Sequence, residues 1–198
     1  MFYKAAYLLV YIWYRSIFFV KVYGRENLPE GGVMVCANHS SLQDPVLAAL
    51  AVGAGNKLRF MAKEELFKNR FFRWLITSLG AFPINRSAND IAAMRKSVEI
   101  LKAGNKLLIF PEGHRVREGE QDSANAKAGY HMLAVMADIS VVPLYITRRK
   151  RVFRRISLVF GQPFKPVKMN GAAMSEQARS LMDTIEQLGK AVGKRREG

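Results

Sequence analysis

The chain has 198 residues, of which 49% are hydrophobic and 24% are charged. This composition excludes a disordered chain and predicts one packed domain, because a chain of this length buries roughly 70% of its unfolded surface on folding. Its single cysteine, Cys36, and its three histidines exclude a disulfide framework and a cysteine-rich zinc site. Any catalytic chemistry must therefore come from histidine, carboxylate and basic side chains.

Lysine and arginine outnumber the acidic residues by 31 to 16, which gives a formal net charge of +15 and a pI near 10.2. The mean hydropathy is nevertheless −0.03, so an apolar segment must offset these cations. A charge of this size indicates an anionic partner, such as nucleic acid, a phospholipid surface, a phosphorylated substrate or an acidic protein. Composition alone does not choose among these partners.

The apolar segment that offsets the cations in the mean hydropathy lies in residues 1–22. The run 5–14 is apolar and aromatic, and Arg15 interrupts it well before the roughly 20 apolar residues that a spanning helix needs. No small-residue cleavage site follows the run, which argues against a signal peptide. Its tyrosine, tryptophan, lysine and arginine residues suit the headgroup boundary of an anionic membrane. An interfacial helix over 1–22 is therefore the favoured interpretation, ahead of a short spanning anchor and a buried helix.

Beyond Gly24 the sequence alternates short β-rich runs with helical patterns. Strands are predicted at 33–37, 58–62, 81–84, 106–110, 141–146 and 156–160. Helical periodicity is clearest over 89–103 and over 175–188. This alternation predicts a single α/β domain over 23–198, with a central, mostly parallel mixed sheet flanked by helices and with sites beyond the strand ends.

The first polar cluster is N-H-S-S-L-Q-D-P at 38–45, between a predicted strand and an apolar helical run. In a continuous helix His39 and Asp44 would point about 140° apart, but in a strand-to-helix turn they can pair. Asp44 followed by Pro45 also suits the start of a helix as N-cap and N1 residues. The functional interpretation makes Asp44 orient the imidazole of His39, whose other ring nitrogen takes a proton from a substrate hydroxyl. Both roles are compatible, because a carboxylate has two oxygens.

Two further clusters are apolar strands with one distinctive residue each. The segment 80–86 ends in Arg86, which is either a solvated cation or a ligand for an anionic substrate. The segment 141–146 contains Pro143, which predicts a sheet edge or a bulge and a wall for an apolar substrate.

The segment 107–115 brings a carboxylate, a glycine and an arginine to the end of a buried strand. Glu112 and Arg115 are suited to a simple surface ion pair. Alternatively, Gly113 between them permits close approach of the backbone to a phosphate, which the guanidinium fork of Arg115 would bind.

The run 147–155 contains six cations and no acidic residue, and such runs are solvated surface by default. One alternative is a nucleic-acid binder, in which these cations neutralise phosphates. We expect no nucleic-acid partner, because no recognised nucleic-acid motif is present and the aromatic residues gather near the N-terminus. Another alternative is a non-catalytic lipid-binding module, which would not need His39 and Asp44.

Taken in order, the four clusters resemble the four blocks of the glycerolipid acyltransferases, particularly the 1-acyl-sn-glycerol-3-phosphate (lysophosphatidic acid) acyltransferases. The resemblance covers nearly all of 24–161. It implies transfer of an acyl group from a thioester of acyl carrier protein or coenzyme A to the sn-2 hydroxyl of lysophosphatidic acid, without a covalent acyl-enzyme. The product would be phosphatidic acid for phospholipid biosynthesis. No cofactor or metal is implied, since the thioester is a co-substrate.

The resemblance also implies site residues and a location. The catalytic dyad falls on His39 and Asp44. The acceptor-binding positions fall on Arg86, Glu112, Gly113 and Arg115. His114 departs from the family, which more often has threonine or serine there. The implied location is the cell membrane, in a peripheral or monotopic arrangement on an anionic surface, with the active site facing the cytoplasm.

Overall fold

The computed structural model describes residues 2–84, 91–116 and 128–194, and these contain one seven-stranded sheet in the order β1-β7-β6-β2-β5-β3-β4. The strands are β1 (Phe19–Tyr23), β2 (Val33–Ala37), β3 (Leu58–Lys63), β4 (Ala81–Ile84), β5 (Lys106–Ile109), β6 (Ser140–Ile146) and β7 (Arg155–Phe160). Every neighbouring pair is parallel except β6 and β7. The predicted α/β fold with a mostly parallel mixed sheet is confirmed.

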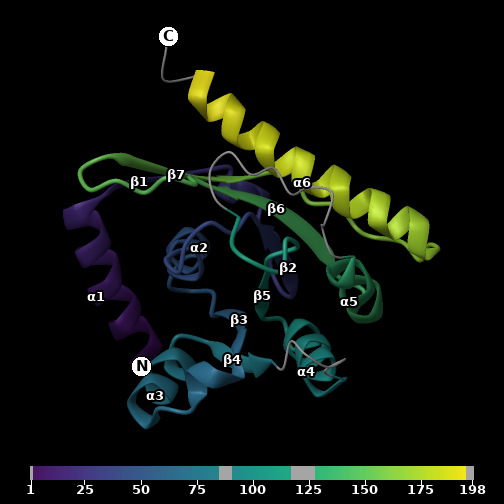
Figure 1. The fold of residues 1–198 in the computed structure, drawn as a ribbon, viewed down its shortest axis with the longest axis horizontal. Coiled ribbons are helices and arrows are strands. Elements are labelled where there is room, and N and C mark those ends of the chain that lie inside the picture. The colour runs from purple at the N-terminus through teal and green to yellow at the C-terminus, as the bar shows by residue number, and fades with distance from the viewer. Residues whose placement is uncertain (1, 85–90, 117–127, 195–198) are drawn as a thin grey trace.

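Helices cover both faces of this sheet (Figure 1). They are α1 (Phe2–Ile17), α2 (Asp44–Val52), α3 (Arg70–Ser78), α4 (Ile91–Lys102), α5 (Gly129–Ala137) and α6 (Gly171–Lys194). The helices α1 and α2 pack on one face, α4, α5 and α6 pack on the other, and α3 lies beside β4. The sequence did not single out α3 or α5. Helix α5 was not predicted because it has apolar residues on its exposed side as well as on its buried side. Leu133 is buried whereas Met136 is exposed, so the apolar residues show no clear 3.6-residue period.

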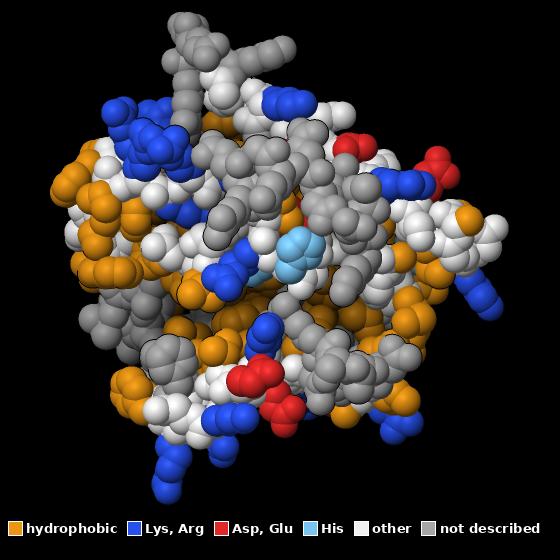
Figure 2. Space-filling model, viewed as in Figure 1, with side chains coloured by type: hydrophobic (Ala, Val, Ile, Leu, Met, Phe, Trp, Pro, Cys, Tyr) orange, Lys and Arg blue, Asp and Glu red, His pale blue; other side chains and the backbone are white. Residues whose placement is uncertain are grey.

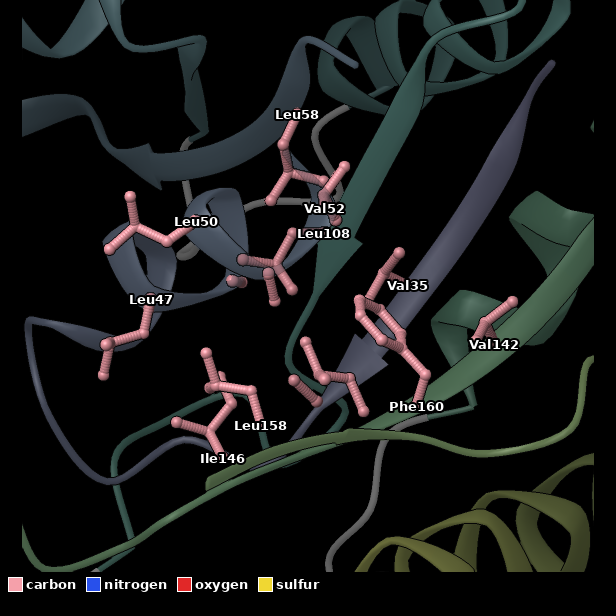
Figure 3. Close-up of a cluster of buried hydrophobic side chains, with 14 of the residues drawn as sticks. Val35, Leu47, Leu50, Val52, Leu58, Leu108, Val142, Ile146, Leu158 and Phe160 are labelled. Atoms are coloured by element: carbon pink, nitrogen blue, oxygen red, sulfur yellow. The ribbon is translucent and has the colours of Figure 1, made fainter. Parts of the chain in front are cut away.

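The central strand β2 is buried along its whole length, because both faces of the sheet are covered. Its side chains alternate between two cores. Val33, Val35 and Ala37 pack toward α1 and α2, whereas Met34 and Cys36 pack toward α4, α5 and α6. Figure 3 shows the first of these cores, with side chains of α2, such as Leu47 and Leu50, and of several strands filling the space between that helix and the sheet. Because alternate side chains of β2 fill two different cores, a shift of the strand by one residue would misplace both sets, and this fixes the residue at which β2 ends.

The N-terminal segment differs from the expected single helix over 1–22. The helix α1 ends at Ile17, and β1 pairs in parallel with β7. In the sequence FVKVY, Val20 and Val22 are partly buried against the core and alternate with the exposed Phe19 and Lys21, a pattern that suits a half-buried strand better than a helix. The expected boundary between 22 and 23 therefore falls inside β1. Within the described residues, no helix combines the length and the hydrophobicity needed to traverse a bilayer.

Pro143 lies in β6, an interior strand between β7 and β2, so the prediction of a sheet edge is wrong. The alternative of a bulge fits the pairing. The register of β6 with the chain after β7 shifts by one residue between the pair Leu144–Phe160 and the bridge Val141–Phe164. Pro143 lies between these pairs and accepts a hydrogen bond from the N–H of Gly161 at 2.8 Å. A proline is tolerated there because this irregular stretch needs no donor from it.

Candidate active site

The candidate site lies where β2, β5 and β6 end. These three strands are parallel neighbours, so their carboxyl ends reach the same edge of the sheet. The segments that follow them are 38–44, 110–116 and 147–150. In α/β folds this edge is where ligands bind, and here it gathers the first, third and fourth sequence clusters.

His39 and Asp44 form the predicted pair. The imidazole Nδ1 lies 2.9 Å from Oδ2 of Asp44, and the same oxygen accepts the backbone N–H groups of Ser40 and Ser41 at 2.7 Å each. The helix α2 begins at Asp44, its N-cap residue is Gln43, and no side chain caps it. The expectation that Asp44 caps α2 is therefore wrong. Its carboxylate instead closes the turn that precedes the helix, and this turn makes the pairing possible.

The other oxygen of Asp44 is bound by the ammonium of Lys150. This lysine side chain is only 5% exposed, and its Nζ also donates to Oγ of Ser40 at 2.9 Å. Burial raises the pKa of the Asp44 carboxyl, but the hydrogen bond with His39 and the nearby Lys150 charge outweigh it and hold that pKa below its usual value. Burial lowers the pKa of Lys150, although Asp44 opposes this effect.

The loop after β5 contacts both the ring and the backbone of His39. The ring of Phe110 stacks on the imidazole, with centroids 4.0 Å apart and planes 16° from parallel. Oε2 of Glu112 accepts the backbone N–H of His39 at 2.7 Å, and the N–H of Val116 donates to the carbonyl oxygen of His39 at 2.8 Å. Since Asp44 engages Nδ1, Nε2 is the ring nitrogen left to meet a substrate. The imidazole side chain is 12% exposed.

Glu112 makes its contacts inside the protein. Its side chain is 2% exposed, and its second oxygen pairs with the guanidinium of Arg148 at 3.2 Å. Arg148 also binds Glu186 of α6, to which its Nε donates at 3.1 Å. Burial raises the pKa of the Glu112 carboxyl, and the hydrogen bonds from His39 and Arg148 offset only part of this shift. The expected alternative of a surface pair with Arg115 is wrong, because the ion-pair partner of Glu112 is Arg148.

The remaining predicted binding residues lie around this centre. Gly113 has φ +72°, a left-handed conformation that favours glycine, and its N–H closes a turn on the carbonyl of Phe110 at 3.0 Å. His114 and Arg115 are exposed on the loop. Arg86 lies outside the described residues. The structure thus brings His39, Asp44, Glu112 and Gly113 together and leaves Arg115 on the surface beside them.

Sequence reasoning missed the two buried cations of the site. It interpreted the run 147–155 as solvated surface, and this is wrong for Arg148 and Lys150. The available signal was their position two and four residues beyond a predicted parallel strand, at the edge that also carries His39. Glu186 gave a weaker signal, since it stands four residues after the buried Met182 on the apolar face of α6.

An apolar pocket adjoins the site at the start of α2. Its lining comes from α1, α2, β3 and the residue after α3, namely Tyr7, Pro45, Val46, Ala49, Leu50, Phe60 and Leu79.

Among the residues that the structure describes, no three His, Cys, Asp or Glu side chains are grouped to hold a metal ion.

The sequence family described as Acyltransferase matches residues 19–147, which include the whole His39–Asp44 turn and the loop after β5. The chain belongs to this acyltransferase family. The 1-acyl-sn-glycerol-3-phosphate acyltransferase of Streptococcus pneumoniae is 32% identical over 171 residues, which are 82% of this chain and 62% of that protein. The enzyme of the same name from Bacillus subtilis is 28% identical over 180 residues, which are 84% of this chain and 88% of that protein.

A solved structure resembles this acyltransferase over most of its length. The crystal structure of the 1-acyl-sn-glycerophosphate (LPA) acyltransferase PlsC from Thermotoga maritima matches with a TM-score of 0.68 and 29% sequence identity. The match covers 95% of this chain and 77% of the Thermotoga chain. The resemblance inferred from the four sequence clusters is therefore confirmed at the level of family and fold.

Proposed function

We propose that this acyltransferase moves a fatty acyl group from an acyl thioester to the sn-2 hydroxyl of 1-acyl-glycerol-3-phosphate, giving phosphatidic acid for phospholipid biosynthesis. The observation that carries the proposal is the His39–Asp44 pair at 2.9 Å, held at the carboxyl edge of the sheet in a member of the acyltransferase family. The names of the Streptococcus and Bacillus relatives support this acceptor.

In the proposed reaction His39 is a general base. Its Nε2 takes the proton of the sn-2 hydroxyl while the hydroxyl oxygen attacks the thioester carbonyl, and Asp44 stabilises the imidazolium that forms. The imidazolium then returns the proton to the departing thiolate, so no covalent acyl-enzyme is needed. A positioned base of this kind contributes roughly 10²- to 10⁴-fold in rate. Phe110 and Glu112 limit the motion of the base, which favours the reactive geometry.

The acceptor phosphate is proposed to bind the guanidinium groups of Arg86 and Arg115, because a planar fork matches phosphate oxygens in pairs. Gly113 supplies the turn that carries the chain from Glu112 to Arg115. Glu112 is proposed to position His39 through its backbone, since both its oxygens are already bonded within the protein.

The donor is proposed to be an acyl thioester of acyl carrier protein or coenzyme A, with no cofactor. Both carriers are anionic, so the net charge of +15 favours docking of either. We also propose a peripheral or monotopic location on the cell membrane, with the active site facing the cytoplasm where these donors occur. Nucleic acid has no place in this function.

The membrane contact is proposed to combine α1 with the β6–β7 turn. Exposed apolar residues of this surface are Leu8, Tyr11, Ile12, Trp13, Phe19, Val152 and Phe153. Exposed cations beside them are Arg15, Lys21, Arg149, Arg151 and Arg154. Figure 2 has Lys and Arg side chains gathered next to a hydrophobic strip, at the edge where α1 and the β6–β7 turn lie in Figure 1. Aromatic and apolar residues flanked by cations suit an anionic bilayer interface.

The two parts of this surface are joined by backbone hydrogen bonds. The N–H of Phe153 donates to the carbonyl of Ile17 at 2.9 Å, and the N–H of Phe19 donates to the carbonyl of Arg154 at 3.3 Å. Phe153 is 70% exposed and has φ 57°, a conformation that is unfavourable for a bulky side chain. An exposed aromatic ring held in such a conformation favours a role in contact with lipid.

The activity is tested with a panel of lysolipid acceptors, each offered acyl groups on acyl carrier protein and on coenzyme A, with products read by mass spectrometry. We expect acylation of 1-acyl-glycerol-3-phosphate and loss of product in His39→Ala. His131→Asn is the control, because His131 lies in α5 on the opposite face of the sheet from α2, where its Nε2 contacts the carbonyl oxygen of Val167 at 2.9 Å, and the folded variant should keep turnover near that of the wild type. Turnover by His39→Ala close to the wild type would refute the mechanism, and acylation of a different lysolipid alone would refute the acceptor.

A further inference from the structure

Lys150 occupies an unusual position for a lysine in a basic surface run. Its ammonium is nearly buried and has three oxygen neighbours: Oδ1 of Asp44, Oγ of Ser40 at 2.9 Å and the carbonyl of Arg148 at 3.4 Å. A lysine ammonium has three N–H donors. Because three protein oxygens face these donors, no N–H group is left over to bind a substrate phosphate.

We propose that Lys150 is a positioning residue that acts through Asp44 to fix the imidazole of His39. This inference rests on the proposed function, in which His39 is the base. Each oxygen of the Asp44 carboxylate has its own donors: Oδ2 faces the turn and His39, and Oδ1 faces Lys150. Rotation of the carboxylate would break both sets at once, so Lys150 holds Oδ2 in the orientation that His39 needs.

The charges around the pair support this role. Asp44 is fully buried, and a buried carboxylate is costly unless a cation compensates it. Arg148 of the same segment is already paired with Glu112 and Glu186, and the ammonium of Lys150 is the counter-charge of Asp44.

The test compares Lys150→Met in the wild type and in Asp44→Asn, measuring kcat, the KM of each substrate and the unfolding midpoint. We expect Lys150→Met to lower kcat by roughly 10- to 100-fold in the wild type, the range for directly interacting groups, with little change in either KM. In Asp44→Asn the same substitution should change kcat by less than about twofold, because the group it acts through is already lost. Lys150→Arg, which keeps the charge, should recover part of kcat.

Lys106→Met is the matched control, because Lys106 is also buried and its ammonium binds the backbone carbonyls of Pro29 and Gly31, away from the site. It should lower stability equally in both backgrounds, without a coupled effect on kcat. If Lys150→Met does not fold, Lys150→Arg takes its place in the same comparison. Equal losses of kcat in both backgrounds would overturn the inference, as would a raised acceptor KM at unchanged kcat. Neither outcome bears on the proposed function, which is tested separately by the turnover of His39→Ala and by the panel of lysolipid acceptors.

Discussion

The side-chain amide of Asn38 pairs with both backbone groups of Ile146: its Nδ2 donates to the carbonyl oxygen, and its Oδ1 accepts the N–H, each at 2.8 Å. The amide thereby continues the β2–β6 ladder by one step with a side chain, just where the main chain leaves the sheet. The residue after Asn38 is His39, and the chain after Ile146 leads to Lys150. This one amide therefore joins two of the three segments that form the site, 38–44 and 147–150.

His39→Ala and Asp44→Ala are expected to separate activity from stability. His39→Ala should lower kcat by roughly 10²- to 10⁴-fold, the contribution of a general base, with a modest loss of stability. Asp44→Ala should lower the free energy of unfolding by about 3–5 kcal/mol, because it leaves Lys150 buried without its counter-charge. Steady-state kinetics and urea unfolding of the two variants measure these effects. A stable Asp44→Ala protein would contradict the buried ion pair.

The stabilising effect of Asp44 should depend on pH. Its folded pKa is lowered, so the ionised carboxylate adds stability that is complete above the unfolded pKa of about 3.9 and is lost as pH falls through the folded value. The difference in unfolding free energy between the wild type and Asp44→Asn should therefore be constant near neutral pH and shrink below about pH 4. Urea titrations across this range measure it, and a difference that stays constant into acid would exclude a lowered pKa.

Substitutions of Glu112 should distinguish positioning of His39 from binding of the acceptor. Glu112→Gln keeps an oxygen for the N–H of His39 but loses the charge that pairs with Arg148, so kcat should fall while the acceptor KM changes little. Glu112→Ala should lower stability by about 3–5 kcal/mol, because it breaks a buried pair. A raised acceptor KM at unchanged kcat in Glu112→Gln would return Glu112 to direct contact with substrate.

Arg115 should act on one substrate only. Arg115→Ala is expected to raise the acceptor KM with a smaller effect on the donor KM, and Arg86→Ala should behave alike, because the group that these two guanidinium forks are proposed to bind is the phosphate of the acceptor. Arg115→Lys should recover binding only in part, since a point charge lacks the paired geometry. Initial rates with each substrate varied in turn provide the measurement. An equal rise in the acceptor KM and the donor KM would indicate a structural role.

Membrane binding should weaken when the aromatic ring of Phe153, in the β6–β7 turn, is removed. Phe153→Asn keeps a residue that tolerates the left-handed backbone, so a drop of about tenfold in vesicle affinity would report lost apolar contact. Trp13→Ser should act similarly. Point substitutions are preferable to deleting α1, because Tyr14 is buried in the core.

The cations of the same surface should respond to salt and lipid charge. Arg151→Gln should weaken binding to vesicles containing phosphatidylglycerol by about 1 kcal/mol and leave binding to pure phosphatidylcholine unchanged. Matched controls on the opposite side of the sheet are Met136→Ser and Arg179→Gln, which should behave as the wild type. If these controls lost as much affinity as the turn variants, the contact would not be specific to this surface.

Much of the fold follows from local sequence pattern. The strands β2, β5 and β6 are short apolar runs bounded by polar clusters, because both their faces are buried, and the sequence predicts each to within one residue. The strand β1 was missed because Phe19 and Val20 continue the apolar character of α1. Its strand conformation depends on the free edge of β7, far away in the chain.

The site divides in the same way. His39 and Asp44 are predictable because a short turn brings them together. Lys150 and Glu186 are not, because what makes them part of the site is a partner distant in sequence: Lys150 is 106 residues from Asp44, and Glu186 is 38 residues from Arg148. Apart from its position shortly after a parallel strand, a cation in a basic run gives no local sign that the fold will bury it.

One buried residue, Phe18, separates α1 from β1, and its N–H bonds back to the carbonyl of Tyr14 at 2.7 Å. With so short a connection, α1 cannot swing on its own without pulling β1 away from β7. The helix is thus a fixed arm of the sheet rather than a tether. If α1 lies in the bilayer surface, it sets the height and tilt at which the catalytic edge meets the headgroups, and the acceptor need not leave the membrane to reach His39.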